Sequence, residues 1–247
     1  MNIESKVALI TGGTHGIGAE TAVKLAKQGV RLSLVARNAR NSEIKKQLTD
    51  PNTEVLLIPA DLSKEDECRR VVKETYDKYG RLDILIHSAG SAAPGSLLNG
   101  AREVWYPAFD IHLHAAFHLV RAAAPLMKEN EAGSVVLISS AAGIRGVKNS
   151  LAYAVVKGAI PQFTRALAFE LADDNIRVNC ISPGVIRTRF QDYLTPTQVK
   201  NNIDNRIPLH REGTCEDVAD AIIMLVKNDF ITGENVVVDG GMTMRIV

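Results

Sequence analysis

Short apolar runs recur along the whole chain, and between them lie longer stretches in which apolar residues return at helical spacing. The runs are continuous rather than alternating, which is typical of strands that are buried on both faces of a sheet. Because strand and helix alternate, the pattern predicts an α/β fold in which right-handed crossovers place helices on both faces of a parallel sheet. The predicted strands are Val7–Ile10, Leu32–Ala36, Val55–Ile58, Ile84–Ile86, Val135–Ile138, Val178–Ile181 and Val236–Val238. The predicted helices are Gly16–Gln28, Ser63–Tyr79, roughly Arg102–Met127, Leu151–Leu171 and Thr214–Val226.

Residues that commonly end or begin helices support these limits. Gly29 and Gly80 directly follow two predicted helices, where glycine enters the left-handed conformation without strain. Thr214 and Asp217 together predict a capping box at the start of another helix. The stretch from 184 to 213 falls outside the pattern and is too long for an ordinary connection. It therefore predicts either a lid over a site or a small helical insertion.

Length, composition and charge limit the architecture and the partners. A chain of 247 residues, 46% of them hydrophobic, buries a substantial core within one large domain. Its 29 basic and 28 acidic residues leave a formal charge of +1, which disfavours nucleic acid or an anionic membrane as partner. The chain enters an apolar run almost at once, without a signal-peptide pattern, and no run has bilayer length, so we expect a cytoplasmic protein. We interpret Cys68, Cys180 and Cys215 as reduced packing residues rather than a disulfide framework or a zinc cluster.

A glycine-rich turn, Thr11-Gly12-Gly13-Thr14-His15-Gly16-Ile17-Gly18, joins the first predicted strand to the first predicted helix. Glycines allow a sharp turn and close approach to a ligand, and the free amides at a helix start attract phosphate oxygens. The spacing differs from the G-x-G-x-x-G pattern, and such a turn can also be a simple strand-helix corner. Its position after the first strand favours a dinucleotide site. The predicted cofactor-binding residues here are Gly12, Thr14, His15, Gly16, Ile17 and Gly18.

The residues after the second and third predicted strands bear on the choice of cofactor. The second strand ends in Ala36-Arg37-Asn38, where an acidic residue would usually bind the adenosine ribose. A guanidinium at Arg37 binds a 2′-phosphate bidentately, so we predict that NADP(H) is preferred over NAD(H); a solvated surface charge is the alternative. Asp61, followed by Leu62, is interpreted either as a hydrogen-bond acceptor for adenine or as a helix-entry aspartate.

Three residues supply the chemistry of carbonyl reduction. Ser140 follows the fifth predicted strand, and Tyr153 and Lys157 are four residues apart on one face of the next helix. A nearby ammonium stabilises phenolate, so it lowers the pKa of a tyrosine that normally titrates near about 10. Tyr153 is then the general acid or base, while Ser140 hydrogen-bonds the substrate oxygen and Lys157 also binds the ribose. Without further context, a Y-x-x-x-K pattern is more often a packed tyrosine beside a solvated lysine.

The order of these motifs resembles the classical short-chain dehydrogenase/reductase family over the whole chain. The resemblance implies a single Rossmann-type, doubly wound domain over 1–247, with a seven-stranded parallel sheet and with 184–213 closing over substrate. It also implies a homotetramer, in which the two long helices and the C-terminal strand form the interfaces. The matching residues are Thr11 to Gly18, Asp61, Ala89, Gly90, Ser140, Tyr153, Lys157, Asn179, Pro183, Gly184, Ile186, Thr188 and Asp239 to Gly241. The resemblance also implies which of the later residues line the cofactor: Ser88, Ala89, Gly90, Pro183, Gly184, Ile186 and Thr188.

The chain departs from the family pattern in two places, and Pro161 is a further unusual feature. His87-Ser88 replaces the usual Asn-Asn before Ala89-Gly90, and His112 stands where the family has its active-site asparagine. A neutral His112 can support the same proton relay, but protonation removes its acceptor nitrogen, so we expect activity to fall between about pH 5 and 7. Pro161 lies inside the helix of Tyr153 and Lys157, where it cannot donate to the carbonyl of Lys157 and should kink the axis.

Other interpretations of the same residues remain open. A dinucleotide-binding protein with little turnover is the alternative function, because His112 replaces the relay asparagine. His114 and His118 have metal-ligand spacing, but a helix surface or a subunit interface is favoured. Ser140 lacks the G-x-S-x-G context of a hydrolase nucleophile. The substrate is equally open among acyl-carrier-protein thioesters, sugars, steroids and small ketones. Cations that hint at an anionic substrate are Arg145, Lys148, Arg187 and Arg189, and predicted packing aromatics are Trp105, Tyr106 and Phe109.

Overall fold

Seven parallel strands form one sheet in the order β3-β2-β1-β4-β5-β6-β7. The computed structural model describes residues 1–48, 53–188, 191 and 194–244. All seven predicted strands are confirmed, most of them one or two residues longer than the apolar run. The strands are β1 (Val7–Thr11), β2 (Arg31–Ala36), β3 (Val55–Pro59), β4 (Ile84–His87), β5 (Gly133–Ile138), β6 (Ile176–Pro183) and β7 (Asn235–Val238).

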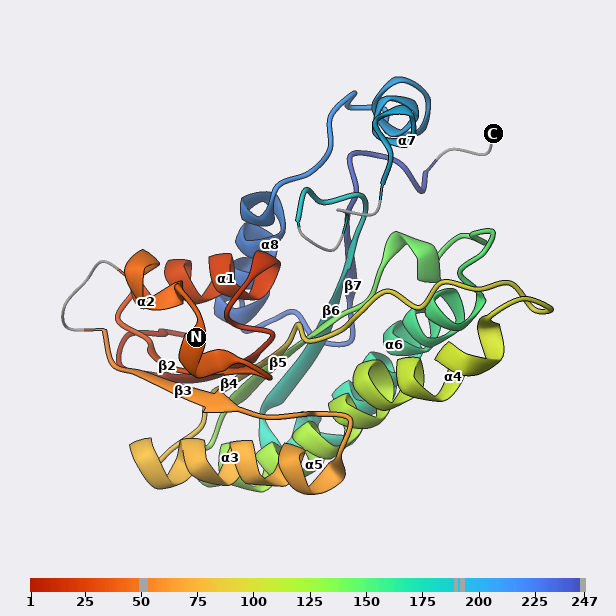
Figure 1. Cartoon of the computed structure of the whole chain (residues 1–247). Coiled ribbons are helices and arrows are strands. Elements are labelled where there is room, and N and C mark those ends of the chain that lie inside the picture. The colour runs from red at the N-terminus through yellow and green to blue at the C-terminus, as the bar shows by residue number, and fades with distance from the viewer. Residues whose placement is uncertain (49–52, 189–190, 192–193, 245–247) are drawn as a thin grey trace.

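Helices cover both faces of the sheet, as the alternating pattern predicts (Figure 1). One face packs against α3 (Glu65–Tyr79), α5 (Ala115–Glu129) and α6 (Leu151–Glu170), with α4 (Ala101–Phe109) lying against α6. The other face packs against α1 (Gly16–Ala26) and α8 (Cys215–Lys227). The short α2 (Ile44–Gln47) contributes Ile44 to this second core. The fold class predicted from the sequence is confirmed.

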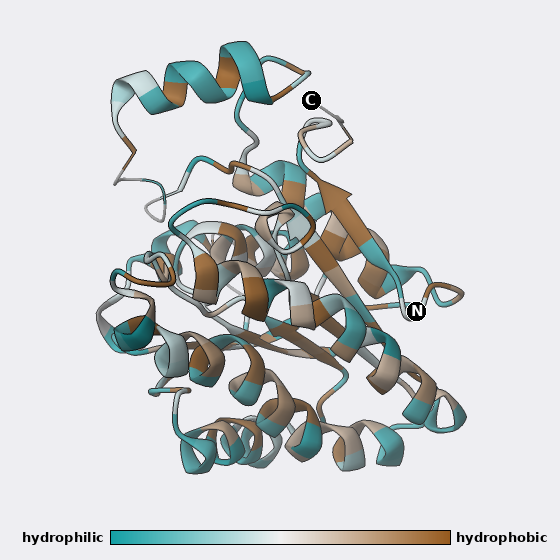
Figure 2. Cartoon of the chain, turned by 90° about the vertical axis from the view of Figure 1, so that its right-hand side faces the viewer, coloured by the Kyte–Doolittle hydropathy of each residue, from teal (hydrophilic) through white to brown (hydrophobic). Residues whose placement is uncertain are grey.

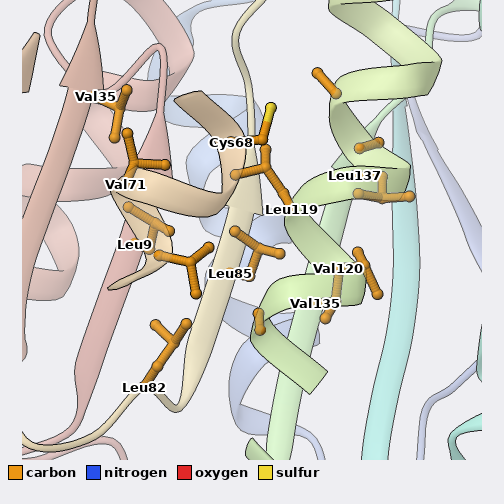
Figure 3. Packing of buried hydrophobic residues seen from close by; sticks show 14 of the residues in the cluster. Leu9, Val35, Cys68, Val71, Leu82, Leu85, Leu119, Val120, Val135 and Leu137 are labelled. Atoms are coloured by element: carbon orange, nitrogen blue, oxygen red, sulfur yellow. The ribbon is translucent and has the colours of Figure 1, made fainter. Parts of the chain in front are cut away.

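The core on the α3 and α5 side shows why these strands need two apolar faces. Leu9, Leu85 and Leu137 come from three strands and are fully buried against Val71 of α3 and Leu119 of α5 (Figure 3). The intervening strand residues, such as Ile10, point to the α1 and α8 core. Because both faces are covered, the apolar runs are continuous, and the strands are correspondingly brown in Figure 2.

The predicted helix at 102–127 is not one α-helix. It consists of α4 and α5 separated by η2 (Asp110–His114), a π-helical turn that contains His112. The extra residue of a π turn is invisible to a search for 3.6-residue spacing, and such turns are frequent at functional sites. A second correction concerns α3, which begins at Glu65 rather than Ser63, because the Ser63 hydroxyl donates to Asp61 at 2.8 Å.

The helix-end signals agree with the structure in other respects. Gly80 ends α3 in the left-handed conformation with φ of 69°. Thr214 and Asp217 form the predicted capping box of α8. The stretch from 184 to 213 contains a helical insertion, α7 (Pro196–Asn201), which lies beyond the ends of β6 and β7 (Figure 1). Within the described ranges, the helices are too short or too polar to cross a membrane.

Candidate active site

The glycine turn sits at the point where the strand order reverses between β1 and β4, which is where doubly wound sheets bind ligands. Gly12 has φ of 65°, and a Cβ atom on it would lie 2.9 Å from the Ala89 backbone nitrogen. A Cβ atom on Gly18 would lie 2.4 Å from the Gly12 oxygen. Larger residues at these positions would push the turn away from the Ser88-Ala89 backbone. The turn therefore packs tightly against the Ser88-Ala89 backbone at the start of α1.

His87 connects this turn to the π-helical segment. Its Nδ1 lies 2.8 Å from the Thr11 hydroxyl, and its Nε2 lies 3.0 Å from the carbonyl oxygen of Ile111. The Ala89 amide also donates to the Thr11 hydroxyl oxygen, at 3.2 Å. Burial and the Lys157 charge lower the pKa of His87 to about 4. A neutral His87 therefore donates from Nε2 to the Ile111 carbonyl and accepts at Nδ1 from the Thr11 hydroxyl, which in turn accepts from the Ala89 amide.

The residues predicted to bind the adenosine end lie at the ends of β2 and β3. Arg37 and Asn38 are exposed, and Arg37 is close enough to Asp61 to contribute to its lowered pKa. Hydrogen bonds from Ser63 are the larger cause of that lowering. Asp61 thus accepts within the turn before α3 rather than capping the helix itself, and its carboxylate remains exposed beside Arg37. The Leu62 side chain is buried in the core, so only its backbone can face a cofactor.

Lys157 is buried at the centre of the site. Its Nζ donates to the carbonyl oxygen of Ile138 at 2.7 Å and lies 5.7 Å from the centroid of the Tyr153 ring. Burial lowers the pKa of Lys157 to about 7. The alternative of a solvated lysine beside a packed tyrosine is therefore wrong, because Lys157 is only 5% exposed.

His112 lies edge-on to the Tyr153 ring, with 5.7 Å between the ring centroids. Its Nε2 is 2.9 Å from the Ser91 carbonyl oxygen, whereas no residue among those described pairs with its buried Nδ1. The ring packs so closely on Gly90 that a Cβ atom there would lie 2.2 Å from it. Burial, together with the Lys157 charge, lowers the pKa of His112 well below its usual value. Burial thus opposes protonation of His112, which argues against the predicted loss of activity between about pH 5 and 7.

Ser140 and the loop after it pack on the helix of Tyr153. Ser140 caps the short helix η3 (Ala141–Gly143) by accepting from the Ala142 amide at 3.1 Å. A Cβ atom on Gly143 would lie 2.6 Å from the Lys157 carbonyl carbon, so the two backbones are in direct contact. The structure therefore gathers Ser140, Tyr153, Lys157 and His112 at the ends of β4 and β5.

The segment after β6 closes the other side of the glycine turn. Ile186 is buried, Gly184 packs on Asp239, and Thr188 is the side chain nearest to Gly16. Pro183 is the last residue of β6. Backbone hydrogen bonds join Arg187 and Val185 to Gly213, each at 2.9 Å, and so pin the two ends of the 184–213 stretch together. A cavity of about 510 Å³ lies at its base, lined by Ile186, Leu209, Val237, Asp239 and Met244 among others.

Several remaining side chains have structural partners. Arg145 donates to the Thr243 carbonyl, and Arg187 pairs with Glu212, which weakens the hint of an anionic substrate. Arg189 lies outside the described residues. His114 pairs with Asp110 at 3.0 Å, and the described part of the chain holds no group of three or more metal-ligating side chains.

Two of the three predicted packing aromatics pack against the core and one does not. Trp105 and Phe109 are partly buried beside the cluster of Ala108 and Val156, with their tilted rings 5.0 Å apart. Tyr106 is 71% exposed, which corrects its assignment as a packing residue.

A residue that the sequence reasoning missed is Ser139, whose hydroxyl donates to the Lys157 carbonyl at 2.7 Å. Pro161 was the signal in the sequence, because a proline there leaves the Lys157 carbonyl in need of another donor.

Comparisons with known proteins agree with this arrangement. A family model described as enoyl-(acyl carrier protein) reductase matches residues 12–243. A tropinone reductase homolog of Arabidopsis thaliana is 34% identical over an alignment of 251 positions, which covers 99% of this chain and 94% of the relative. The Pseudomonas aeruginosa RhlG complex with NADP has a TM-score of 0.91 at 29% identity, covering 98% of each chain. A 7α-hydroxysteroid dehydrogenase in complex with NADH and a 7-oxo bile acid has a TM-score of 0.92 at 28% identity, covering 100% of this chain and 97% of its own. The chain therefore belongs to the classical short-chain dehydrogenase/reductase family.

Proposed function

We propose that this protein is an NADP(H)-dependent oxidoreductase acting on a carbonyl or secondary alcohol carbon of a small substrate. The single observation that carries the proposal is the buried Lys157 side chain, whose Nζ donates to the Ile138 carbonyl and lies 5.7 Å from the centroid of the Tyr153 ring. When Lys157 is protonated, its charge favours the phenolate form of Tyr153 in a site that water screens little. Tyr153 then gives a proton to the substrate oxygen during reduction, or removes it during oxidation.

The other residues bind and orient the reactants in this proposal. Ser140 donates a hydrogen bond to the substrate oxygen, on which negative charge develops. The amides at the start of α1 hold the diphosphate of the dinucleotide, and Lys157 donates to the nicotinamide ribose. The bound nicotinamide supplies or accepts the hydride. The 184–213 segment covers the substrate, and the pinning of its ends at Gly213 supports this role.

The first test is turnover. Purified protein is mixed with NADPH and a panel of β-ketoacyl thioesters, sugars, steroid ketones and small ketones, and nicotinamide absorbance is followed. We expect oxidation of NADPH with at least one class.

A second candidate, a dinucleotide-binding protein with little turnover, is favoured by the buried His112 Nδ1, to which none of the described residues donates. Tight NADPH binding without turnover on any substrate would support that candidate instead.

The preference for NADP(H) rests on the exposed guanidinium of Arg37 after β2. Homologous folds have been solved with NADP and with NADH, so the fold leaves the choice of dinucleotide to the side chains at this corner. We expect wild-type protein to bind NADPH more tightly than NADH. Arg37→Ala should reduce the ratio of the two affinities by about ten- to a hundredfold, since a charge-assisted hydrogen bond contributes roughly 1.5–3 kcal/mol. Fluorescence titration with both cofactors measures the ratio. Lys45→Ala, which removes a nearby exposed cation, is the control; equal wild-type affinities would contradict the preference.

The histidine in place of the relay asparagine gives a further prediction. Because burial opposes protonation of His112, we expect His112→Asn to retain activity within about an order of magnitude. Its pH-rate profile should follow that of the wild type from pH 5 to 7. The two profiles are compared on one substrate with saturating cofactor. A wild-type profile that falls over this range, while that of His112→Asn stays flat, would show that His112 titrates despite its burial.

A homotetramer is the proposed assembly, and a cytoplasmic location accompanies it. Large apolar side chains are exposed on two faces of the described chain, which a further copy of the chain would cover. Size-exclusion chromatography with light scattering tests this assembly, and a monomer would refute it. Exposed residues on the α4, α5 and α6 face are Tyr106, Phe117 and Val155, and those near β7 are Phe169, Phe230 and Val237.

A further inference from the structure

Pro161 leaves one carbonyl of the catalytic helix without its usual partner. In an α-helix the carbonyl oxygen of residue 157 accepts from the amide of residue 161, and proline has no amide hydrogen. The carbonyl concerned belongs to Lys157, which is buried. An unpaired carbonyl at this depth would destabilise the helix where the site needs it fixed. Nevertheless, α6 runs without interruption from Leu151 to Glu170.

Ser139 supplies the missing donor. Its hydroxyl donates to the Lys157 carbonyl oxygen at 2.7 Å, and its side chain is buried, with the residue only 2% exposed. Its own amide donates to the Ile181 carbonyl of β6 at 2.7 Å, so the hydroxyl is carried by a fixed part of the sheet. The hydroxyl thus takes the place of an amide that the helix lacks.

The same strand end also holds the other end of Lys157. The Ile138 carbonyl accepts from Nζ at 2.7 Å, and Ser139 binds the backbone of the same lysine. The next residue, Ser140, is the proposed ligand of the substrate oxygen. Three consecutive residues therefore connect the lysine to the substrate side of the site.

We propose that Ser139 is a positioning residue, which places Lys157 relative to Ser140 by replacing the amide that Pro161 lacks. The proposal rests on the proposed function for the role of Lys157. Ser139 touches neither the cofactor nor the reacting atoms in this scheme. Its effect passes through the backbone of Lys157.

A double-mutant cycle between Ser139 and Pro161 tests this proposal. Ser139→Ala should lower kcat and NADPH affinity by roughly fivefold each, because the buried carbonyl loses its donor. Pro161→Ala should stay within about twofold of wild type, since Ser139 still holds the carbonyl. In Ser139→Ala/Pro161→Ala the new alanine amide donates to Lys157, so both quantities should return to within about twofold of Pro161→Ala. A residue that only stabilises the fold would not show this recovery of kcat per folded molecule.

Ser134→Ala is the matched control, because Ser134 is a fully buried serine on β5 whose hydroxyl has no hydrogen-bond partner among the described residues. It should leave kcat and NADPH affinity unchanged. Equal losses from Ser139→Ala in the wild-type and Pro161→Ala backgrounds would overturn the proposal, as would a Ser139→Ala variant with wild-type kcat and affinity. If Ser139→Ala does not fold, recovery of folding and activity in the double variant supports the proposal, and failure of both variants overturns it.

The outcome of the double-mutant cycle can be interpreted independently of the proposed function. If the wild type turns over no substrate of the panel, the oxidoreductase proposal fails while NADPH affinity still reports the placement of Lys157. The same pattern of loss and recovery in NADPH affinity then supports the role of Ser139. Its absence refutes that role whether or not the protein is an enzyme.

Discussion

Tyr153→Phe is expected to lower turnover by about 10²- to 10⁴-fold, the range contributed by general acid-base groups. The substitution removes only the hydroxyl, and the ring keeps its contacts with the His112 ring and with Lys157 Nζ, each 5.7 Å from its centroid. NADPH affinity should stay within about twofold of wild type, because binding energy and proton transfer are separate contributions. Turnover is measured with saturating NADPH on a substrate found with the carbonyl panel, and affinity by fluorescence titration.

The control for Tyr153→Phe is Tyr106→Phe, which removes the hydroxyl of a tyrosine that is 71% exposed. It should leave turnover unchanged. Wild-type turnover in Tyr153→Phe would exclude Tyr153 as the proton-transfer group. A loss of NADPH affinity equal to the loss of turnover would assign Tyr153 to cofactor binding instead.

Lys157→Met is expected to lower turnover by at least about 10²-fold, comparable to removing a buried electrostatic group from an active site. Methionine fills a similar volume but lacks the charge that supports the Tyr153 phenolate and the donor that holds the ribose. NADPH affinity should therefore fall as well. This double loss distinguishes Lys157 from Tyr153, whose substitution is expected to affect turnover alone.

The same substitution has an opposite effect on stability, and its sign depends on pH. Burial lowers the pKa of Lys157 from 10.5 to about 7, so the folded state disfavours the charged lysine. Between these two values the unfolded chain binds a proton that the folded protein does not, and wild-type stability rises with pH. Below pH 7 the buried charge destabilises the fold by a few kcal/mol at most, against which the bond to Ile138 contributes about 1 kcal/mol.

We therefore expect cofactor-free Lys157→Met to melt above wild type at pH 6, by a few degrees. The difference should shrink and change sign as the pH rises toward 10, because the wild-type lysine becomes neutral and keeps its hydrogen bond. Thermal unfolding at several pH values measures this, with Lys148→Met as the control on an exposed lysine. A difference in melting temperature that is independent of pH would mean that Lys157 is charged to the same extent in both states.

Much of this site could be predicted from local patterns. The glycine turn, Tyr153 and Lys157 depend on spacing along one strand-helix corner or one helical face, and a local pattern carries that information. The burial of Lys157 could not be predicted in this way, because the residues that surround it come from β4, β5 and the π-helical segment. Spacing also gave the wrong picture of 102–127, since the π turn at His112 is stabilised by tertiary contacts such as His87 with Ile111.

Pro161 shows what the sequence determines by itself and what depends on the tertiary structure. The sequence alone determines that the Lys157 carbonyl loses its helical partner, because proline has no amide hydrogen at any position. It also determines the seven strands and their alternation with helices, since a strand covered on both faces is apolar throughout. Only the tertiary structure decides that Ser139, 18 residues earlier, satisfies that carbonyl. It likewise decides that the pKa of His112 is lowered, because the pKa of a side chain depends on the groups that surround it in space rather than on its neighbours in the chain.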